Sequence, residues 1–229
     1  MSEQTTLKPP HSIGNSDSKT LVCFAVKEEA APFQKALPPA SSVTILLTGM
    51  GPRNAAKSIR QAITTDKPAL VLTCGFAGGL RPDLKTGDIL FANATDPQLA
   101  TALTSAAAQP GRFHCAERVA VTAAEKQELR SKTGADAVEM ESAIICAICR
   151  ENEIPTATVR VILDPANEDL PLDFNKLMTA DDELSYTKLS AALALAPGKI
   201  GALLRLQKQS QTAAQALARV LESVLKSST

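Results

Sequence analysis

Uninterrupted apolar runs of strand length constrain the fold of this chain more than any other feature. The clearest are TLVCFAV from Thr20, VTILLT from Val43 and TATVRVIL from Thr156. A strand with one face in water alternates apolar and polar residues, whereas a continuous run suits a strand that is covered on both faces. Stretches with helical spacing separate the runs. This alternation predicts an α/β fold in which a sheet is sandwiched between helices.

The same patterns give the expected boundaries of the elements. Strands are expected at residues 20–26, 43–48, 69–74, 86–92, 118–121, 135–138 and 156–164. Helices are expected at residues 27–37, 54–63, 97–108, 123–132 and 141–151, with one or two long helices over 198–225. Residues 75–79 are expected to form a loop of small residues, and residues 1–19, which are polar and lack a period, a disordered leader. Residues 20–229 are expected to form a single domain.

Charge and composition narrow the class of partner. Lys plus Arg and Asp plus Glu both number 24, so the chain carries no net charge that would attract nucleic acid or an anionic membrane. Aromatic residues make up only 3%, which leaves few platforms for stacking bases of a single strand. No stretch is apolar and long enough to span a membrane, and no signal peptide is evident. We therefore expect a small-molecule partner and a cytoplasmic protein.

Carboxylates and glycine turns follow the predicted strands, where ligands gather in open α/β sheets. These groups are Glu28 and Glu29, Thr48 to Gly51, Gly75 to Gly79, Glu139 to Glu141, and Asp164. They predict one rim that grips a polar, uncharged ligand through its hydroxyls and supports acid and base chemistry. The alternative for Glu139 is that its carboxylate caps the start of the next helix. The alternative for the glycines is a pair of tight turns.

Other motifs favour packing over chemistry. Gly49-Met50-Gly51 begins like a dinucleotide fingerprint, but Asn54 stands where a third glycine would be, so a nicotinamide-dependent oxidoreductase is only a weak alternative. The pair Cys146 and Cys149 lies within a predicted helix and is interpreted as core. His11 and His114 lack partners at metal spacing, and neither a metal nor a cofactor is expected. In the last helix, the leucines at 203, 204 and 206 are expected to pack on the sheet or on a neighbouring subunit.

Five motifs in order resemble the nucleoside phosphorylase and nucleosidase superfamily, particularly 5'-methylthioadenosine/S-adenosylhomocysteine nucleosidases. They are AVKEEAAPF, TGMGPRNAA, TCGFAGGLRPDLKTGDIL, GADAVEMES and VRVILDPA. The resemblance covers nearly everything after Thr20. It implies a three-layer sandwich around a central, mixed, mostly parallel twisted sheet. It also implies cleavage of the N-glycosidic bond of an adenosine-type nucleoside, and a homodimer or higher homo-oligomer.

The resemblance also implies roles for individual residues. Glu29 would activate the attacking water, and Asp164, four residues after a matching Arg160, would protonate or hydrogen-bond the purine at N7. Glu141 would grip the ribose hydroxyls while Met140 packs on the sugar. The remaining substrate-binding candidates are Phe76, Ala77, Gly78, Glu139, Thr48 and Gly49.

The acceptor of the sugar separates two activities of the same superfamily. Phosphorylases supply Arg and Ser to phosphate, but this chain has the acidic run Lys27-Glu28-Glu29 at the first of those sites and Thr73 and Phe76 at the second. Since a carboxylate repels a phosphate dianion at close range, water is favoured as the acceptor. Phosphorolysis remains the alternative, with Lys27, Arg53 and Arg81 as candidate phosphate partners.

The chain also departs from the family pattern. The stretch between Ile89 and Val119 is shorter than in typical methylthioadenosine nucleosidases and has no evident aromatic residue to stack on the purine. A nucleoside-binding protein without catalysis is therefore a further alternative. DAVEMES and ILDPANEDLP resemble the hopanoid-associated branch, which implies a substrate with an apolar 5' tail.

Overall fold

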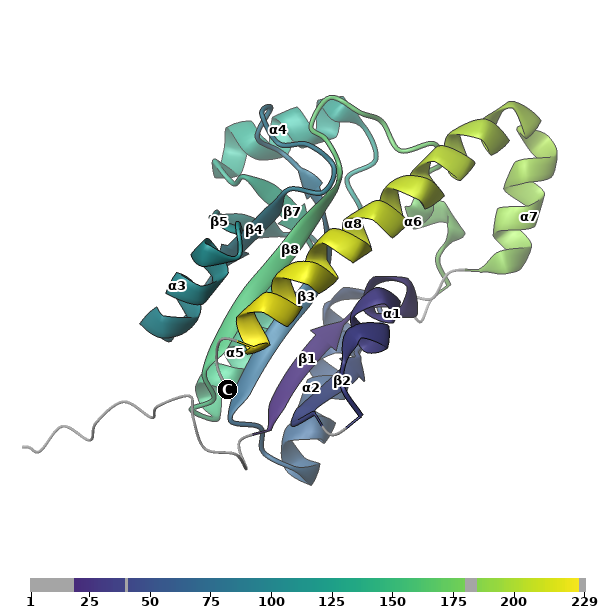
Figure 1. The fold of residues 1–229 in the computed structure, drawn as a ribbon. Helices are drawn as coiled ribbons and strands as arrows, with labels where there is room; N and C mark the ends of the chain where they lie inside the picture. The colour runs from purple at the N-terminus through teal and green to yellow at the C-terminus, as the bar shows by residue number, and fades with distance from the viewer. Residues whose placement is uncertain (1–18, 40, 180–184, 227–229) are drawn as a thin grey trace, which may run out of the picture.

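The computed structural model describes residues 19–39, 41–179 and 185–226. Within them, eight strands form one mixed sheet in the order β2-β1-β3-β8-β4-β5, and β7 joins β6 to the end of β3 (Figure 1). The strands are β1 (Thr20–Phe24), β2 (Val43–Leu47), β3 (Leu70–Gly79), β4 (Ile89–Ala92), β5 (Gln109–Pro110), β6 (Phe113–Cys115), β7 (Ala137–Glu139) and β8 (Thr156–Asp164). The central pairs β2–β1, β1–β3 and β3–β8 are parallel, while β4 runs antiparallel to β8. This confirms the predicted α/β architecture.

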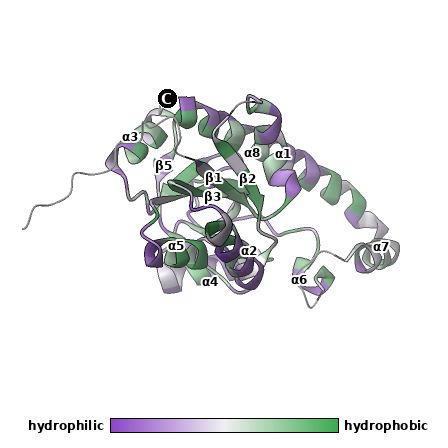
Figure 2. Cartoon of the chain, turned by 90° about the horizontal axis from the view of Figure 1, so that it is seen from below, coloured by the Kyte–Doolittle hydropathy of each residue, from purple (hydrophilic) through white to green (hydrophobic). Residues whose placement is uncertain are grey.

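Helices cover both faces of the sheet and make the predicted three layers (Figure 2). One layer holds α1 (Lys27–Ala36), α3 (Pro97–Ser105) and the long α8 (Ile200–Lys226). The other holds α2 (Gly51–Thr65), α4 (Ala123–Thr133) and α5 (Ser142–Glu151). The short α6 (Phe174–Leu177) and α7 (Tyr186–Leu195) stand beside the layers, with a 3-10 turn at Pro197–Lys199 leading into α8.

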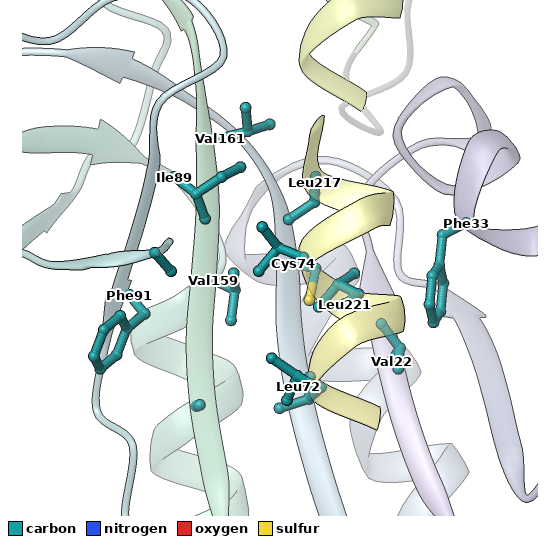
Figure 3. Close-up of a cluster of buried hydrophobic side chains, with 14 of the residues drawn as sticks. Val22, Phe33, Leu72, Cys74, Ile89, Phe91, Val159, Val161, Leu217 and Leu221 are labelled. Atoms are coloured by element: carbon teal, nitrogen blue, oxygen red, sulfur yellow. The ribbon is translucent and has the colours of Figure 1, made fainter. Parts of the chain in front are cut away.

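The continuous apolar runs are explained by burial on two sides. Along β1, Val22 and Phe24 face a core shared with α1 and α8, whereas Leu21 and Cys23 face a core shared with α2 and α5. Figure 3 shows the first core, in which Leu217 and Leu221 of α8 lie against residues of the central strands. Both faces of the central strands are therefore shielded from solvent, and their sequences do not need to alternate apolar and polar residues.

Several element predictions were wrong. Residues 75–79 continue β3 rather than forming a loop, because β8 runs beside them and Gly78 and Gly79 also pair with β7. Residues 118–121 form no strand, and the segment between β8 and the final helix, for which no element was predicted, contains α6 and α7. Strands β5 and β6 were not predicted, since they are only two and three residues long.

The buried face of the final helix lies in its second half, beyond the leucines at 203, 204 and 206 that were predicted to pack on the sheet or on a neighbouring subunit. Residues from Ala213 to Val224 supply the buried face of α8. Nearer the start, Leu204 is 61% exposed instead of packing on the sheet. The first half of α8 reaches past the strands toward α7 (Figure 1), which explains the exposure. Cys146 and Cys149 are buried in α5, as expected for core residues.

Three further predictions concern the leader, the single domain and membrane-spanning segments. Residues 1–18 of the predicted leader and His11 within it lie outside the described residues. The single domain over 20–229 stays a prediction. Among the described helices, none combines the length and the apolar character needed to cross a bilayer.

Truncation of a core leucine of α8 should destabilise the protein strongly. Leu221 is 0% exposed, so Leu221→Ala removes buried methyl groups and leaves a cavity, at an expected cost of about 2–5 kcal/mol in the free energy of unfolding. Leu204→Ala in the exposed half of the same helix is the matched control and should change it by less than about 0.5 kcal/mol. Urea denaturation followed by circular dichroism measures both, and equal losses would contradict the assignment of the core.

Candidate active site

The polar groups predicted at the strand ends do meet at one edge of the sheet. Glu29 lies in the first turn of α1 directly after β1, Glu139 ends β7, and Asp164 ends β8. Glu141 immediately precedes α5 and is likewise buried. The parallel strands β1 and β8 place their carboxyl ends at a common edge. Strand β7 runs antiparallel to the end of β3, and its pairing with Gly78 and Gly79 brings Glu139 to the same edge.

Arg160 is the centre of this group. Its side chain is 1% exposed and reaches from the middle of β8 toward three carboxylates. The Nη2 atom lies 2.5 Å from Glu139 Oε2 and 3.5 Å from Glu141 Oε2, and Nη1 donates to the Cys74 carbonyl at 2.9 Å. A buried guanidinium is stable only when paired and hydrogen-bonded, and here the neighbouring carboxylates raise its pKa further.

Glu29 is held by backbone amides on two sides. Its Oε1 accepts from Phe76 N at 2.7 Å, and its Oε2 accepts from Ala25 N at 2.9 Å and Val26 N at 3.2 Å. Burial raises the pKa of Glu29 to about 7, although Arg160 and the Phe76 amide oppose the shift. A carboxylate with a pKa near neutrality is suited to accept a proton during a reaction.

Gly75 allows the strand to pass between these two side chains. Its φ is +146°, and a Cβ there would lie 2.6 Å from Arg160 Nη1 and 2.7 Å from Glu29 Oε1. Only glycine fits this position, because any side chain would occupy the space of the site itself. The glycine cluster therefore serves close approach within a strand, rather than the loop that the sequence predicted.

Glu139 and Glu141 have different environments although they are two residues apart. Glu139 accepts from the backbone N–H groups of Glu141 and Ser142 and from the Ser142 hydroxyl, so the predicted cap at the start of α5 is present. Burial alone would raise the pKa of Glu139, but Arg160 and these hydrogen bonds outweigh it and the pKa is lowered. Burial raises the pKa of Glu141, which accepts from Gly51 N, at the start of α2, at 2.9 Å.

Asp164 stands apart from the Arg160 group and has its own cation. Lys126 of α4 is 0% exposed, and its Nζ lies 2.5 Å from Asp164 Oδ2. Burial raises the pKa of Asp164 to about 6, against the lowering effect of Lys126. Gly78 pairs with Asp164 across β3 and β8, and a Cβ on Gly78 would lie 3.5 Å from Oδ2.

The other predicted binding residues differ in how they face this edge. Phe76 and Met140 are partly exposed, so part of each side chain is accessible. The Ala77 side chain is buried in a small core with Leu84 and Ile162, which leaves the backbone of this residue as the part that the resemblance implies for the pocket. Thr48 is 3% exposed, and its hydroxyl donates to backbone carbonyls, including that of the adjacent Gly49 at 3.0 Å.

Of the candidate phosphate partners, Arg81 contacts two carboxylates. It hydrogen-bonds Asp83 at 2.8 Å and lies 3.7 Å from Asp136. Lys27 and Arg53 are exposed residues in the first turns of α1 and α2. Among the described residues, no cluster of three His, Cys, Asp or Glu side chains could hold a metal ion.

Sequence reasoning missed Lys126 and gave Arg160 no role of its own. Lys126 belongs to a helix rich in charged residues, and nothing in its spacing marks it as the buried one. Arg160 carried a signal that could have been used. A single charge inside the buried run TATVRVIL must find a counter-charge at the same depth.

The chain matches a family model described as the phosphorylase superfamily over residues 33–97 and 91–226. The chain belongs to the phosphorylase superfamily. A 5'-methylthioadenosine/S-adenosylhomocysteine nucleosidase of Actinobacillus succinogenes is 30% identical over 170 residues, which cover 60% of this chain and 74% of that protein. The matched residues contain four of the five motifs, and the first motif, AVKEEAAPF, ends at Phe33, where the match begins.

Solved structures share the fold at low sequence identity. A futalosine hydrolase mutant of Helicobacter pylori has a TM-score of 0.67 at 18% identity, covering 92% of this chain and 99% of the other. A nucleosidase from Neisseria meningitidis in complex with methylthio-immucillin-A has a TM-score of 0.68 at 19% identity, covering 92% and 99%. The phosphorylase superfamily fold therefore extends over nearly all of this chain.

Removal of the central guanidinium should destabilise the folded protein. Arg160→Met leaves Glu139 and Glu141 buried without their counter-charge, and we expect a loss of about 3–5 kcal/mol in the free energy of unfolding. Arg60→Met removes an exposed arginine from α2 and should cost less than about 0.5 kcal/mol. Chemical denaturation compares the two variants, and wild-type stability for Arg160→Met would contradict the pairing.

Proposed function

We propose that this protein hydrolyses the N-glycosidic bond of an adenosine-type nucleoside and releases the purine base. The observation that carries the proposal is a pair of buried carboxyl groups in separate surroundings, since backbone amides hold Glu29 and Lys126 lies beside Asp164. Burial raises the pKa of Glu29 to about 7 and that of Asp164 to about 6. Two such groups suit a reaction that needs both a base and an acid. The nucleosidase relatives and the hydrolase structures support the same reaction class.

The chemistry assigns one carboxyl group to each end of the breaking bond. As the C1'–N9 bond breaks, positive charge grows on the ribosyl ring and the bonding electrons move to the purine. Glu29 takes a proton from the attacking water, and Asp164 gives a proton to the purine at N7. Glu141 binds the ribose hydroxyls, and its negative charge favours the cationic ring in the transition state.

The charge balance around Arg160 favours water over phosphate. Glu29, Glu139 and Glu141 all interact with this one guanidinium, so Arg160 has no surplus positive charge with which to hold a phosphate dianion. A dianion placed there would meet buried carboxylates at short range, where repulsion is strong. Phosphorolysis is the second candidate, with the exposed Lys27 and Arg53 as its supporting observation.

Three finer proposals concern the 5' substituent of the substrate, the oligomeric state and the location of the protein. We propose an apolar 5' substituent on the nucleoside, supported by the resemblance of DAVEMES and ILDPANEDLP to the hopanoid-associated branch. The exposed leucines Leu195 and Leu204 support a homodimer or higher homo-oligomer. The cysteines at 23, 74, 115, 146 and 149 are all free thiols, which supports a cytoplasmic location.

Release of free base identifies the reaction directly. Methylthioadenosine, S-adenosylhomocysteine, adenosine, inosine and an adenosine with an apolar 5' tail are each incubated with the protein, with and without phosphate. We expect adenine release that does not depend on phosphate, and fastest release from the tailed adenosine. Strict dependence on phosphate would establish a phosphorylase, and binding without release would establish a silent nucleoside-binding protein.

Neutral isosteres of the two carboxyl groups should abolish turnover without unfolding the protein. Glu29→Gln and Asp164→Asn each remove one proton-transfer group, and we expect kcat to fall by about 10²–10⁴-fold. Glu28→Gln is the matched control for the first, since Glu28 is an exposed neighbour in the same turn. Base release at saturating substrate provides the measurement, and unchanged kcat in either variant would remove that residue from the mechanism.

The pH dependence follows from the same two groups. Glu29 must be ionised to accept a proton, so activity rises with pH through its titration, whereas Asp164 must be protonated, so activity falls through its own. Because the pKa of the base, about 7, lies above that of the acid, about 6, only a small fraction of the enzyme holds both in the required form. We expect the pH profile of kcat/KM to be bell-shaped, with its maximum at about pH 6.5. A profile that is flat between about pH 5 and 8 would contradict both roles.

A further inference from the structure

Lys126 is the most deeply buried lysine in the part of the chain that the structure describes, and the proposed reaction does not yet use it. It projects from α4, whose other lysine, Lys132, is 68% exposed and pairs with a glutamate one turn away. Burial of an ammonium group is costly unless hydrogen bonds replace its water shell. The surroundings of Lys126 must therefore supply hydrogen-bond acceptors and a counter-charge.

Those acceptors all come from the end of β8 and the loop that follows it. The Nζ atom donates to the Pro165 carbonyl at 2.8 Å and to the Glu168 carbonyl at 2.7 Å, and it lies 2.5 Å from Asp164 Oδ2. Lys126 thus binds the loop and the carboxyl group with one side chain. The orientation of Asp164 is thereby tied to a side chain of α4.

We propose that Lys126 is a positioning residue that stabilises the ionised form of Asp164 as that group gives its proton to the leaving purine. This inference rests on the proposed function. In the step, the C1'–N9 bond breaks and its electrons go to the base. The proton of Asp164 moves to purine N7, and the carboxylate left behind is met by the ammonium of Lys126, which keeps its own protons.

In the form of the enzyme that reacts, Asp164 is protonated, so its negative charge grows as the proton moves to the purine, and the arrangement then favours the transition state. A cation that is already in place needs no reorganisation, and its effect is strong in a buried site. The charged groups around Asp164 are Lys126 on α4, which lowers the pKa of Asp164, and Glu168 in the following loop, which raises it. Lys126 is the cation of this set.

Kinetics of Lys126→Met test the role. We expect kcat/KM for adenine release to fall at least about tenfold, as expected when support for a general acid is lost. Because the group that lowers the pKa of Asp164 is gone, the pH optimum should move to higher pH. Lys132→Met, on the same helix, should leave both the rate and the optimum unchanged. An unchanged optimum for Lys126→Met would overturn the proposal.

A double-mutant cycle separates this role from simple loss of structure. In the Asp164→Asn background, Lys126→Met should cause no further loss of rate, since no carboxylate forms there. An equal loss in both backgrounds would show a structural role only and would overturn the proposal. Lys126→Gln is the second variant if the methionine variant fails to fold, with the same expectations.

An NMR titration distinguishes failure of this inference from failure of the proposed function. The carboxyl carbon of Asp164, assigned by its loss in Asp164→Asn, should titrate at higher pH in Lys126→Met than in the wild type. That shift is expected even if no nucleoside is hydrolysed, a result that would overturn the proposed function alone. Identical titration in the two proteins would overturn the pairing of Lys126 with Asp164.

Discussion

One guanidinium buried among carboxylates is the interaction on which the rest of this structure depends. Arg160 compensates Glu139 and Glu141 directly and moderates the pKa of Glu29. Without it, three acidic groups could not share a dry edge of the sheet, because each would be protonated or would draw in water. The same arrangement requires glycine at position 75, because a side chain on Gly75 would displace either Arg160 or Glu29.

The site has two electrostatic units rather than one. The Arg160 group holds the carboxylates at one end of the proposed bond cleavage, and the Lys126–Asp164 pair holds the other. Each unit has its own cation, so the two carboxyl groups of the proposed acid and base experience different fields. Because the two surroundings differ, one carboxyl group can act as a base and the other as an acid at the same pH.

Much of this arrangement could be predicted from the sequence, and the exceptions have physical reasons. Burial on both faces made the central strands visible as apolar runs, and the strand ends then located Glu29, Glu139, Glu141 and Asp164. The extension of β3 through Gly79 was missed, because glycines signal turns by propensity while here β7 and β8 impose extended pairing. Lys126 could not be found, since the acceptors that bury it lie about forty residues away.

The long helix α8 has a consequence for how the molecule is made. Its buried residues between Ala213 and Val224 form one wall of the main core, and β8 completes the centre of the sheet only after β4 has been synthesised (Figure 3). During translation, β3 and β4 therefore precede β8, the strand that joins them, and α8, which covers the core. An apolar sheet face awaiting its last helix is a target for chaperones and for aggregation. Expression at low temperature or with a chaperone that holds nascent chains should favour soluble protein.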